Sequence, residues 1–375
     1  MASVRTRRIA AFLVSLPLTA GLMTGLAPAA SAALDWGDAT VLSTSEQSYA
    51  QGLVALSSST TVAVYTECCG LVKTRRTTDS GATWKPPVTV SRHGDTPAIS
   101  GMGKMVDVTW RDEGTDQVMY RRSTDAGRSF HPAIALTGPS NWATPDTAVV
   151  RGTGGTVVAL WETVYPHYAV KARVSTDGGK TFGAPITVAK NVTIGTVAVA
   201  MGDGELYVAY LSGGVLKLKT SANLGHSWSR AIELEQGPLY GWRQPSISAE
   251  GNEAYVVYPD QNGSVFYRRT ADAGLTWSDA MSLHESAARP DWDASPQIAL
   301  TDGIVRAVFY ADLTPKASGI VYRESADGIN WTDMEYVCIY GERPYLAVGN
   351  APIVVYDVYE PGALRVEAQV RPPGS

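Results

Sequence analysis

The sequence predicts an all-β fold, a β-propeller of seven four-stranded blades, from three observations. An eight-residue pattern occurs six times along the chain, at intervals of 46 to 55 residues. Short β-rich runs bounded by Gly, Pro, Asn and Asp separate the copies, and no segment from Leu34 onward shows helical periodicity. Four such runs fit into each interval. Four antiparallel strands repeated at this period indicate a propeller.

The repeated pattern reads hydroxyl, any, Asp, any, Gly, any, hydroxyl, aromatic. An Asp or Asn in a tight turn accepts hydrogen bonds from backbone N–H groups just ahead of it. The Gly supplies the positive φ of a hairpin corner, and the aromatic packs under the sheet. The pattern therefore predicts a β-hairpin with a hydrogen-bonded turn. Its Asp or Asn positions are Asp79, Asp125, Asp177, Asn223, Asp272 and Asp327, the last in a copy that is one residue short.

These copies resemble the Asp-box, also called the bacterial neuraminidase (BNR) repeat, of sialidase-like β-propellers. In that family the box is structural. It joins the third and fourth strands of a blade, on the face away from the ligand. The resemblance therefore implies that the six Asp and Asn residues of the pattern stabilise the fold and do no chemistry. It also implies that a ligand would bind at the opposite face.

The chain begins with the features of a secretory signal peptide. Three arginines among the first eight residues precede an apolar run from Ile9 to Leu26, and Ala30-Ser31-Ala32 offers a small-residue cleavage site. A membrane anchor is the alternative, but the run is short and carries Pro, Gly and Ser. We therefore expect residues 1–32 to be removed. Residues 33–375 then form a single propeller domain of a secreted, extracellular protein.

The number of blades follows from the length of the chain. The 343 residues after Ala32 give 49 per blade for seven blades and 57 for six, and the pattern spacing averages about 50. The last three predicted strands carry no box, and Asp35–Ser43 resembles the exit of a box. We expect this N-terminal strand to complete the last blade, which leaves no inner edge unpaired. Six blades with decorated ends are the alternative.

The composition fits a soluble exported protein, with 45% hydrophobic residues, 18% charged residues and a formal net charge of −5. No basic excess suggests nucleic acid as a partner. The three cysteines exclude a disulfide framework. Cys68 and Cys69 could form a vicinal disulfide, one of them could pair with Cys338, or all could be thiols. The five histidines form no metal-spaced pair and no cofactor motif occurs, so we expect neither metal nor cofactor.

Large aromatic residues stand at matching ends of the predicted strands. Propeller sheets need large side chains between them, so we expect these residues to pack between blades rather than to bind a ligand. They are Trp110, Trp161, Tyr210, Tyr258 and Tyr310.

The loops at the face opposite the boxes are predicted to form a recognition surface, because they differ from blade to blade while the boxes repeat. Aromatic faces stack on sugar rings, and Arg and carboxylate groups bind hydroxyl or acidic groups. The candidate ligand-binding residues are Arg111, Trp142, His167, Tyr168, Trp242, Arg289, Trp292 and Arg343.

Sialidases bind the substrate carboxylate with three arginines and use a Tyr nucleophile, a Glu partner and an Asp acid/base. Trp242-Arg243-Gln244-Pro245 is similar to the stretch that carries their first arginine, although it falls in the fifth predicted blade rather than at the chain start. Glu162 with Tyr165 resembles the Glu–Tyr pair. The resemblance therefore makes Arg243, Glu162 and Tyr165 the candidates for catalysis.

The main functional hypothesis is a lectin-like, carbohydrate-binding propeller that recognises an extracellular glycan or glycoconjugate. It rests on the scaffold resemblance, the aromatic-rich loops and the incomplete catalytic set. One alternative is an exo-acting, sialidase-like glycosidase. A second is a protein-binding propeller in a secreted assembly. We expect no nucleic acid partner and no membrane span in the mature chain.

Overall fold

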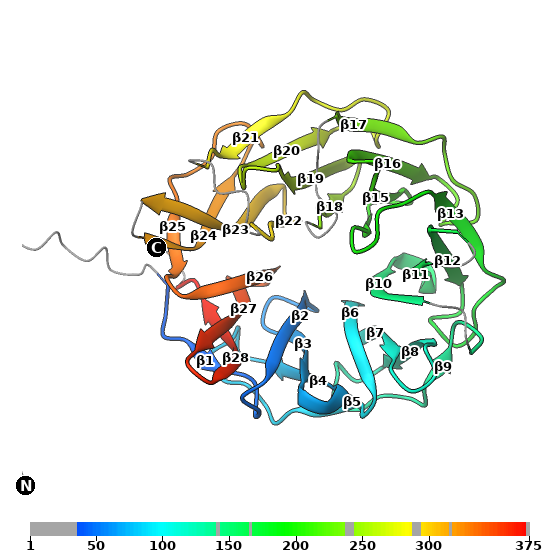
Figure 1. Ribbon diagram of the computed structural model, residues 1–375, viewed down its shortest axis with the longest axis horizontal. Helices are drawn as coiled ribbons and strands as arrows, with labels where there is room; N and C mark the ends of the chain where they lie inside the picture. The colour runs from blue at the N-terminus through cyan, green and yellow to red at the C-terminus, as the bar shows by residue number, and fades with distance from the viewer. Residues whose placement is uncertain are drawn as a thin grey trace, which may run out of the picture. The chain divides into compact units, whose positions relative to one another are not determined.

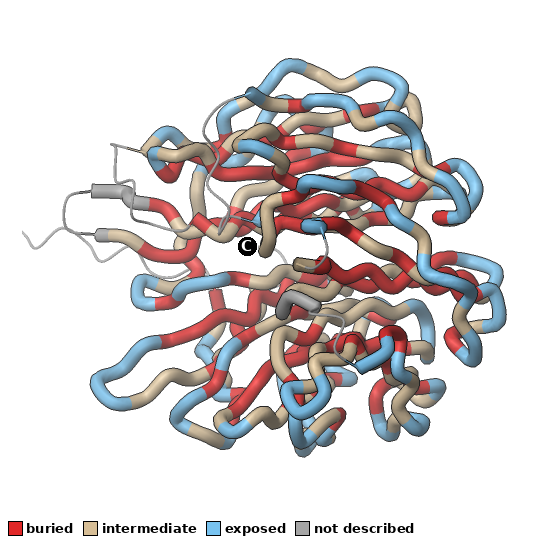
Figure 2. The backbone as a smooth tube through the Cα atoms, turned by 45° about the vertical axis from the view of Figure 1, so that its right-hand side comes forward, coloured by how far each residue is buried: buried red, intermediate tan, exposed pale blue. Residues whose placement is uncertain are grey.

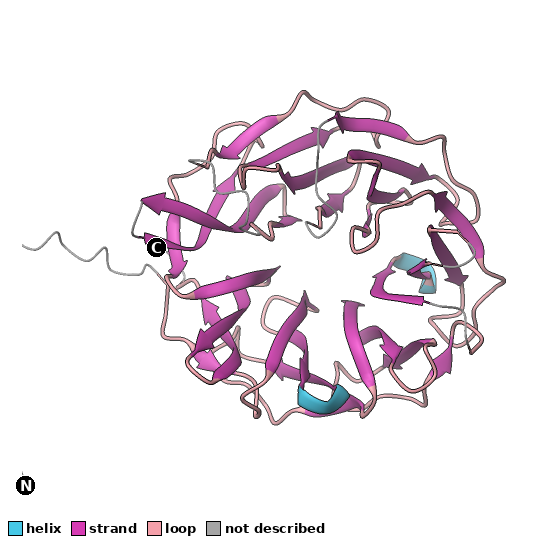
Figure 3. Ribbon diagram, in the orientation of Figure 1, coloured by secondary structure: helices cyan, strands magenta, loops and turns pink. Residues whose placement is uncertain are grey.

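The computed structural model describes residues 36–139, 143–164, 167–236, 244–286, 294–314 and 317–372. They belong to one compact unit, Leu34–Ser375. In the described residues, seven antiparallel sheets of four strands stand in a ring (Figure 1). The only helical turns described are η1 (Cys68–Gly70) and η2 (Thr153–Gly155), as Figure 3 shows. The predicted seven-bladed propeller is confirmed, and the six-bladed alternative is wrong.

In each blade the strands run in order from the axis outward. Blades 1 to 3 comprise β2 (Ser48–Ala55), β3 (Thr61–Glu67), β4 (Leu71–Thr77) and β5 (Val88–Ser91); β6 (Gly94–Met102), β7 (Met105–Asp112), β8 (Val118–Ser123) and β9 (Ile134–Ala135); and β10 (Ala143–Arg151), β11 (Val157–Thr163), β12 (Ala169–Ser175) and β13 (Ile186–Lys190).

Blades 4 to 7 repeat this order. They comprise β14 (Ala198–Met201), β15 (Leu206–Ser212), β16 (Val215–Ser221) and β17 (Ile232–Gln236); β18 (Ser246–Glu250), β19 (Glu253–Pro259), β20 (Val265–Thr270) and β21 (Met281–His284); β22 (Gln297–Thr301), β23 (Ile304–Thr314), β24 (Ala317–Ser325) and β25 (Glu335–Cys338); and β26 (Gly341–Val348), β27 (Pro352–Glu360), β28 (Ala363–Val370) and β1 (Thr40–Val41).

The ring is closed by the N-terminal strand, as predicted. β1 pairs with β28, with Thr40 opposite Ala368 and Val41 opposite Glu367. The flanking residues pack on both sides of blade 7. Trp36 lies edge-on against Tyr322 of blade 6, with ring centroids 5.4 Å apart. Leu42 is fully buried between blades 7 and 1.

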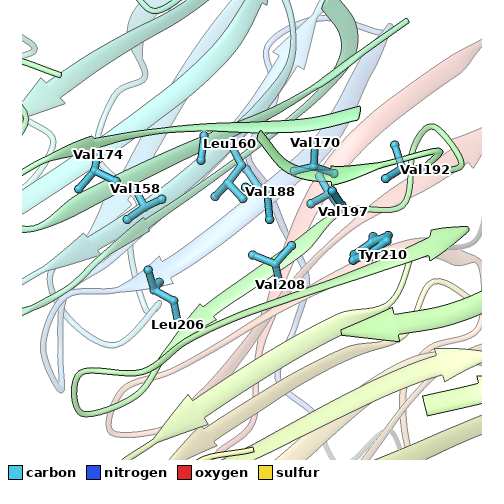
Figure 4. Packing of buried hydrophobic residues seen from close by; sticks show 13 residues of the cluster. Val158, Leu160, Val170, Val174, Val188, Val192, Val197, Leu206, Val208 and Tyr210 are labelled. Atoms are coloured by element: carbon cyan, nitrogen blue, oxygen red, sulfur yellow. The ribbon is translucent and has the colours of Figure 1, made fainter. Parts of the chain in front are cut away.

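The hydrophobic core consists of seven clusters, one between each pair of neighbouring blades. Figure 4 shows the cluster between blades 3 and 4, where Val158 and Leu160 meet Leu206 and Val208. Because neighbouring blades cover both faces of a sheet, the second strands are buried throughout, as in β3 and β11. Burial on both faces explains why the second strands read as apolar runs rather than alternating patterns. Exposed residues concentrate in the loops (Figure 2).

Four of the five aromatics predicted to pack between blades do so: Trp110, Trp161, Tyr210 and Tyr258 are buried in these clusters. The prediction is wrong for Tyr310, which is only half-buried. Its neighbour Phe309 is fully buried against blade 5 instead. Consecutive side chains of a strand point to opposite faces, so a shift of one residue exchanges the packed aromatic.

The six repeated turns share one hydrogen-bond scheme. In every copy the first hydroxyl donates to the Asp or Asn Oδ1, at 2.7–3.0 Å. In five copies the Gly N–H donates to that hydroxyl, and the backbone N–H of the second hydroxyl residue donates to the same Oδ1. In the short copy, Ile329 and Asn330 donate their amides to Asp327. A single side chain therefore joins both arms of each hairpin.

An arginine four residues before the turn Asp links each of three blades to the blade before it. Arg75 donates to the Leu42 carbonyl at 2.9 Å, Arg121 to the Val90 carbonyl at 2.7 Å and Arg323 to the Leu283 carbonyl at 2.7 Å. Each acceptor belongs to the outer strand of the preceding blade or adjoins it. These guanidinium groups tie neighbouring sheets together at the rim of the ring.

Ring closure makes a mutational prediction. Leu42→Ala should lower the free energy of unfolding by about 2–5 kcal/mol, because it leaves a cavity between the first and last blades. Val41→Ala is the matched control, since Val41 precedes Leu42 and is 41% exposed. It should change stability by less than about 0.5 kcal/mol. Urea unfolding compares the two variants, and equal losses would contradict the closure.

The repeated turn makes a second prediction. Hydrogen bonds from the Thr83 hydroxyl, and then from Thr77 and the Thr83 amide, lower the pKa of Asp79 to about 2. Because the folded pKa lies below the unfolded value of about 3.9, this stabilisation is present above pH 4 and is lost as the pH falls toward 2.

Asp79→Ala should destabilise the protein by about 1–2 kcal/mol at pH 7. Asp79→Asn should cost less, because Asn223 occupies the same position in blade 4 and accepts the Ser227 amide at 2.8 Å. Thermal unfolding at pH 7 and pH 3 measures both variants. An Asn variant as unstable as the Ala variant at pH 7 would refute the shared role.

Candidate functional site

The two ends of the ring are built from different connections. The repeated turns meet the turns between first and second strands: Ser80 donates its amide to the Ser59 carbonyl at 2.9 Å, and Gly178 donates to Gly155 at 2.8 Å. Both kinds of turn therefore share one end. The connections from second to third strand, and from one blade to the next, emerge at the other end. We call this other end the open face.

A cavity of about 470 Å³ lies where the inner strands begin, at the open face. A smaller cavity of about 240 Å³ shares most of its polar lining. Inner strands of six of the seven blades, or the connections that enter them, contribute to the first cavity, which is of a size typical of small-molecule sites. We call it the central cavity. Its polar lining includes Gln51, Asp146, Gln244, Gln297, Arg343 and Tyr345.

Backbone irregularities place several of these side chains. The register shifts between Ala50 and Gly52 in β2, between Ala143 and Thr147 in β10, and between Glu342 and Tyr345 in β26. Gln51, Asp146 and Arg343 lie within these three shifts. A β-bulge bends the strand and redirects its side chains. The same inner strands therefore carry both regular blade packing and irregular positions that line the cavity.

Prolines mark the entrances of five inner strands: Pro97, Pro145, Pro245, Pro296 and Pro344. An inner strand has a neighbour on one side only, so a residue without an N–H can stand there without losing a ladder hydrogen bond.

The residues immediately before three of these prolines have positive φ: Thr96 at 43°, Ser295 at 36° and Arg343 at 50°. Residues before proline favour extended backbone, and this conformation costs about 1–3 kcal/mol at each position. Such strain clusters at functional sites, and here the three residues line the central cavity or the smaller cavity that shares its lining.

Two carboxyl groups at this end have raised pKa values. Burial, and then the negative charge of Asp95, raises the pKa of Asp146 to about 6. Burial raises the pKa of Asp357 to about 7, although Asp357 accepts the Ala50 amide at 2.6 Å and lies 3.9 Å from the Arg343 guanidinium. Each of these two carboxyl groups therefore titrates near neutral pH. Groups of this kind suit proton transfer or hydrogen bonding in either protonation state.

An exposed tyrosine stands beside a cation of the central cavity. The Arg343 guanidinium lies 5.8 Å from the centre of the Tyr49 ring. Two further tyrosines of blade 7 are exposed: Tyr340, 78% exposed, just before β26, and Tyr359, 69% exposed, near the end of β27. Exposed aromatic rings beside a cation form a surface on which a sugar ring can stack.

The structure separates the residues predicted to bind a ligand. Arg343 lines the central cavity. Arg111 pairs with Asp116 inside its own loop. His167 lines a different cavity, and Tyr168 is about half exposed in the same loop. Trp142, Tyr165, Trp242, Arg243, Arg289 and Trp292 lie outside the described residues.

Glu162, predicted as a catalytic partner, is fully buried at the end of β11. Its carboxylate accepts the backbone amides of Gly195 and Thr196, at 2.7 and 3.2 Å. Gly195 belongs to the wall of the central cavity. Glu162 therefore holds a loop that shapes the cavity, and its hydrogen bonds give it a positioning role.

Of the three cysteine arrangements that the sequence left open, the structure has free thiols, and the vicinal disulfide is not formed. The sulfur atoms of Cys68 and Cys69 lie 3.3 Å apart, and a disulfide bond is about 2.05 Å long. Cys338 is also a free thiol. Within the described ranges, no group of three or more His, Cys, Asp and Glu side chains could hold a metal ion. No helix in those ranges is long and apolar enough to span a bilayer.

Most cavity residues escaped sequence analysis. The signal that could have found them is the blade-opening proline, since Asp146, Gln244, Gln297 and Tyr345 each adjoin one. Gln51 has no such neighbour. Its placement depends on the bulge in β2, which no local pattern reveals.

Comparison with solved structures places this geometry among known propellers. The chain aligns with the Hadza microbial sialidase Hz136 at a TM-score of 0.53 and 17% identity, covering 71% of this chain and 63% of that one. It aligns with a Trypanosoma rangeli sialidase at 0.54 and 12%, covering 87% and 55%. The fold is that of the sialidase-like propellers.

The chain spans less than two thirds of the length of either sialidase. It also aligns with a polysaccharide lyase of family PL25, an ulvan lyase, at a TM-score of 0.55 and 10% identity, covering 86% of this chain and 94% of that one. No family model and no curated protein matches the sequence. At these identities the alignments establish the shared fold.

The raised pKa of Asp146 makes a third prediction. Its folded value of about 6 lies above the unfolded value of about 3.9, so its contribution to stability is full below pH 4 and is lost as the pH rises through 6. Asp146→Asn should therefore stabilise the protein at pH 7, by up to roughly 3 kcal/mol, and have no such effect near pH 4.

Asp203→Asn is the control, because Asp203 is exposed in a turn at the opposite end of the ring. Melting temperatures across pH 4 to 8 measure the difference. A stabilisation by Asp146→Asn that does not depend on pH would rule out the buried-charge explanation.

Proposed function

We propose that the protein is an exported carbohydrate-recognition propeller that binds an extracellular glycan in the central cavity. The observation that carries the proposal is the lining of this cavity. Three glutamine amides, one carboxyl group and one guanidinium converge from five blades in a space of about 470 Å³. Amides donate and accept at once, so they can bind adjacent sugar hydroxyls without a net charge.

The surroundings of the cavity support the same ligand class. Tyr49 offers an exposed ring beside Arg343, and Tyr340 and Tyr359 offer exposed rings elsewhere in blade 7. The solved propellers of the same fold include sialidases and a polysaccharide lyase, which supports a sugar as the ligand class. The basic and apolar N-terminal stretch with its small-residue cleavage site supports export.

The test is a glycan array followed by calorimetry with the best ligand. Gln297→Ala should weaken binding roughly tenfold, because it removes a hydrogen bond and leaves a polar sugar group unsatisfied. Tyr49→Ala should weaken it several-fold by removing a stacking surface beside Arg343, without changing the melting temperature. Asp203→Asn is the control at the opposite end. Failure of the array to show any saturable ligand, or full binding by Gln297→Ala, would overturn the assignment.

A second candidate function is an exo-acting glycoside hydrolase. The observation that favours it is Asp146, a carboxyl group in the central cavity with a pKa raised to about 6. A group of this pKa remains partly protonated near neutral pH and can donate a proton to a leaving oxygen. Release of a fluorescent aglycone that is lost in Asp146→Asn would favour this function. Saturable binding without turnover favours recognition alone.

A further inference from the structure

A second cavity lies between blades 2 and 3, and it shares no lining residue with the central cavity. Its volume is about 290 Å³, near the lower limit for small-molecule sites. Leu136, Trp161 and Pro185 form part of its apolar wall. We call it the lateral groove. Its basic lining consists of His167, Lys171, Arg173 and Lys190, and no carboxylate is among the described residues that line it.

On its blade 2 side the groove is bordered by the residues that follow β9, which are Leu136, Thr137 and Gly138. These residues remain bonded to the β8 side of the sheet. Leu136 donates its amide to the Val118 carbonyl at 2.8 Å, the Thr137 hydroxyl accepts the Val118 amide at 2.9 Å, and the Gln117 side chain donates to the Thr137 carbonyl at 2.7 Å. The blade 2 wall of the groove is therefore fixed by hydrogen bonds.

Equivalent cations in other blades have acidic partners. Lys73 and Lys217 stand six residues before their turn Asp or Asn, as Lys171 does. Lys73 pairs with Glu67, and Lys217 pairs with Glu233 at 3.2 Å. Lys171 instead donates to the Thr187 hydroxyl at 2.6 Å. Equivalent positions in the blades can therefore be compared directly. Lys171 of blade 3 has no carboxylate partner among the described residues, unlike Lys73 and Lys217.

Arg173 departs from its equivalents in the same way. Arg75, Arg121 and Arg323 donate to a carbonyl of the preceding blade, and Arg268 lies 3.3 Å from the Glu235 carboxylate. Among the residues that the structure describes, Arg173 donates only to the Gly183 carbonyl of its own blade, at 3.0 Å. No ion pair between described residues involves Lys171, Arg173 or Lys190.

The charge of the groove contrasts with that of the chain. The protein has a formal net charge of −5, yet three permanently basic side chains and one histidine share this groove. Their mutual repulsion is relieved by an anion, which gains charge-assisted hydrogen bonds from ammonium and guanidinium groups.

We propose that the lateral groove is a second binding site, for an anionic group, sulfate or carboxylate, carried by a saccharide. The saccharide part rests on the proposed function of the central cavity, and the anionic part rests on the groove alone. The two sites together would let one glycan chain, or two neighbouring chains, engage the protein at the open face and at its side.

The experiment is calorimetry of the full chain with three oligosaccharides of equal length, one sulfated, one carrying uronate carboxylates and one neutral, and with inorganic sulfate. The test variant is Lys171→Gln with Lys190→Gln. The matched control is Lys217→Gln, at the equivalent position of blade 4. The double variant should bind the anionic oligosaccharides at least roughly tenfold more weakly, with binding of the neutral one unchanged. The preference between sulfate and uronate identifies the anion.

Several outcomes would overturn the proposal. Anionic oligosaccharides bound equally well by wild type and the double variant would exclude the groove. Wild-type protein that binds no anionic probe would do the same. Inorganic sulfate bound as tightly as the sulfated oligosaccharide would remove the saccharide from the assignment. Asp146→Asn separates the two sites, since it should leave anion binding intact even if the central cavity binds no glycan.

Discussion

Face-to-face packing of neighbouring sheets is the constraint on which the structure depends. No blade has a core of its own. Each hydrophobic cluster is shared by two blades, so every sheet requires a neighbour on both faces. An open array would expose the outer faces of its first and last sheets, and closing the ring removes this exposure. The short pairing of β1 with β28 therefore matters beyond its two residues, because it carries Trp36 and Leu42 into the two interfaces of blade 7. The arginines that reach from one blade to the previous one reinforce the same arrangement at the rim.

The ring divides its stabilising and functional features between two ends. One end carries the repeated turns, in which local hydrogen bonds satisfy the Asp or Asn side chain and the Gly takes up the positive φ. The open face carries the irregular features: bulges, residues of positive φ before proline, and carboxyl groups of raised pKa. These features reduce stability where they occur. The regular blades around them hold the strained positions in place, which is how a rigid scaffold presents a polar cavity.

The lateral groove shows what a repeated architecture reveals by internal comparison. Lys171 and Arg173 occupy positions that are ion-paired or linked to a neighbouring blade elsewhere in the ring. A basic residue on a surface has little meaning alone. A basic residue that lacks the partner present in equivalent blades indicates a different use of the same position, and here the position lines a groove between blades 2 and 3.

The sequence by itself determined the parts of this protein that depend on local physics. The spacing of the turns, their hydrogen-bonding residues and the unpaired final strands were sufficient to predict seven blades and their closure. The sequence did not determine which side of a strand Tyr310 occupies, because a shift of one residue reverses the face. It did not determine the central cavity either. Gln51, Asp146 and Gln297 are ordinary residues in their local context, and they meet only because bulged inner strands from distant parts of the chain converge on one axis. Tertiary structure decided the sites, since a cavity is a property of several blades at once.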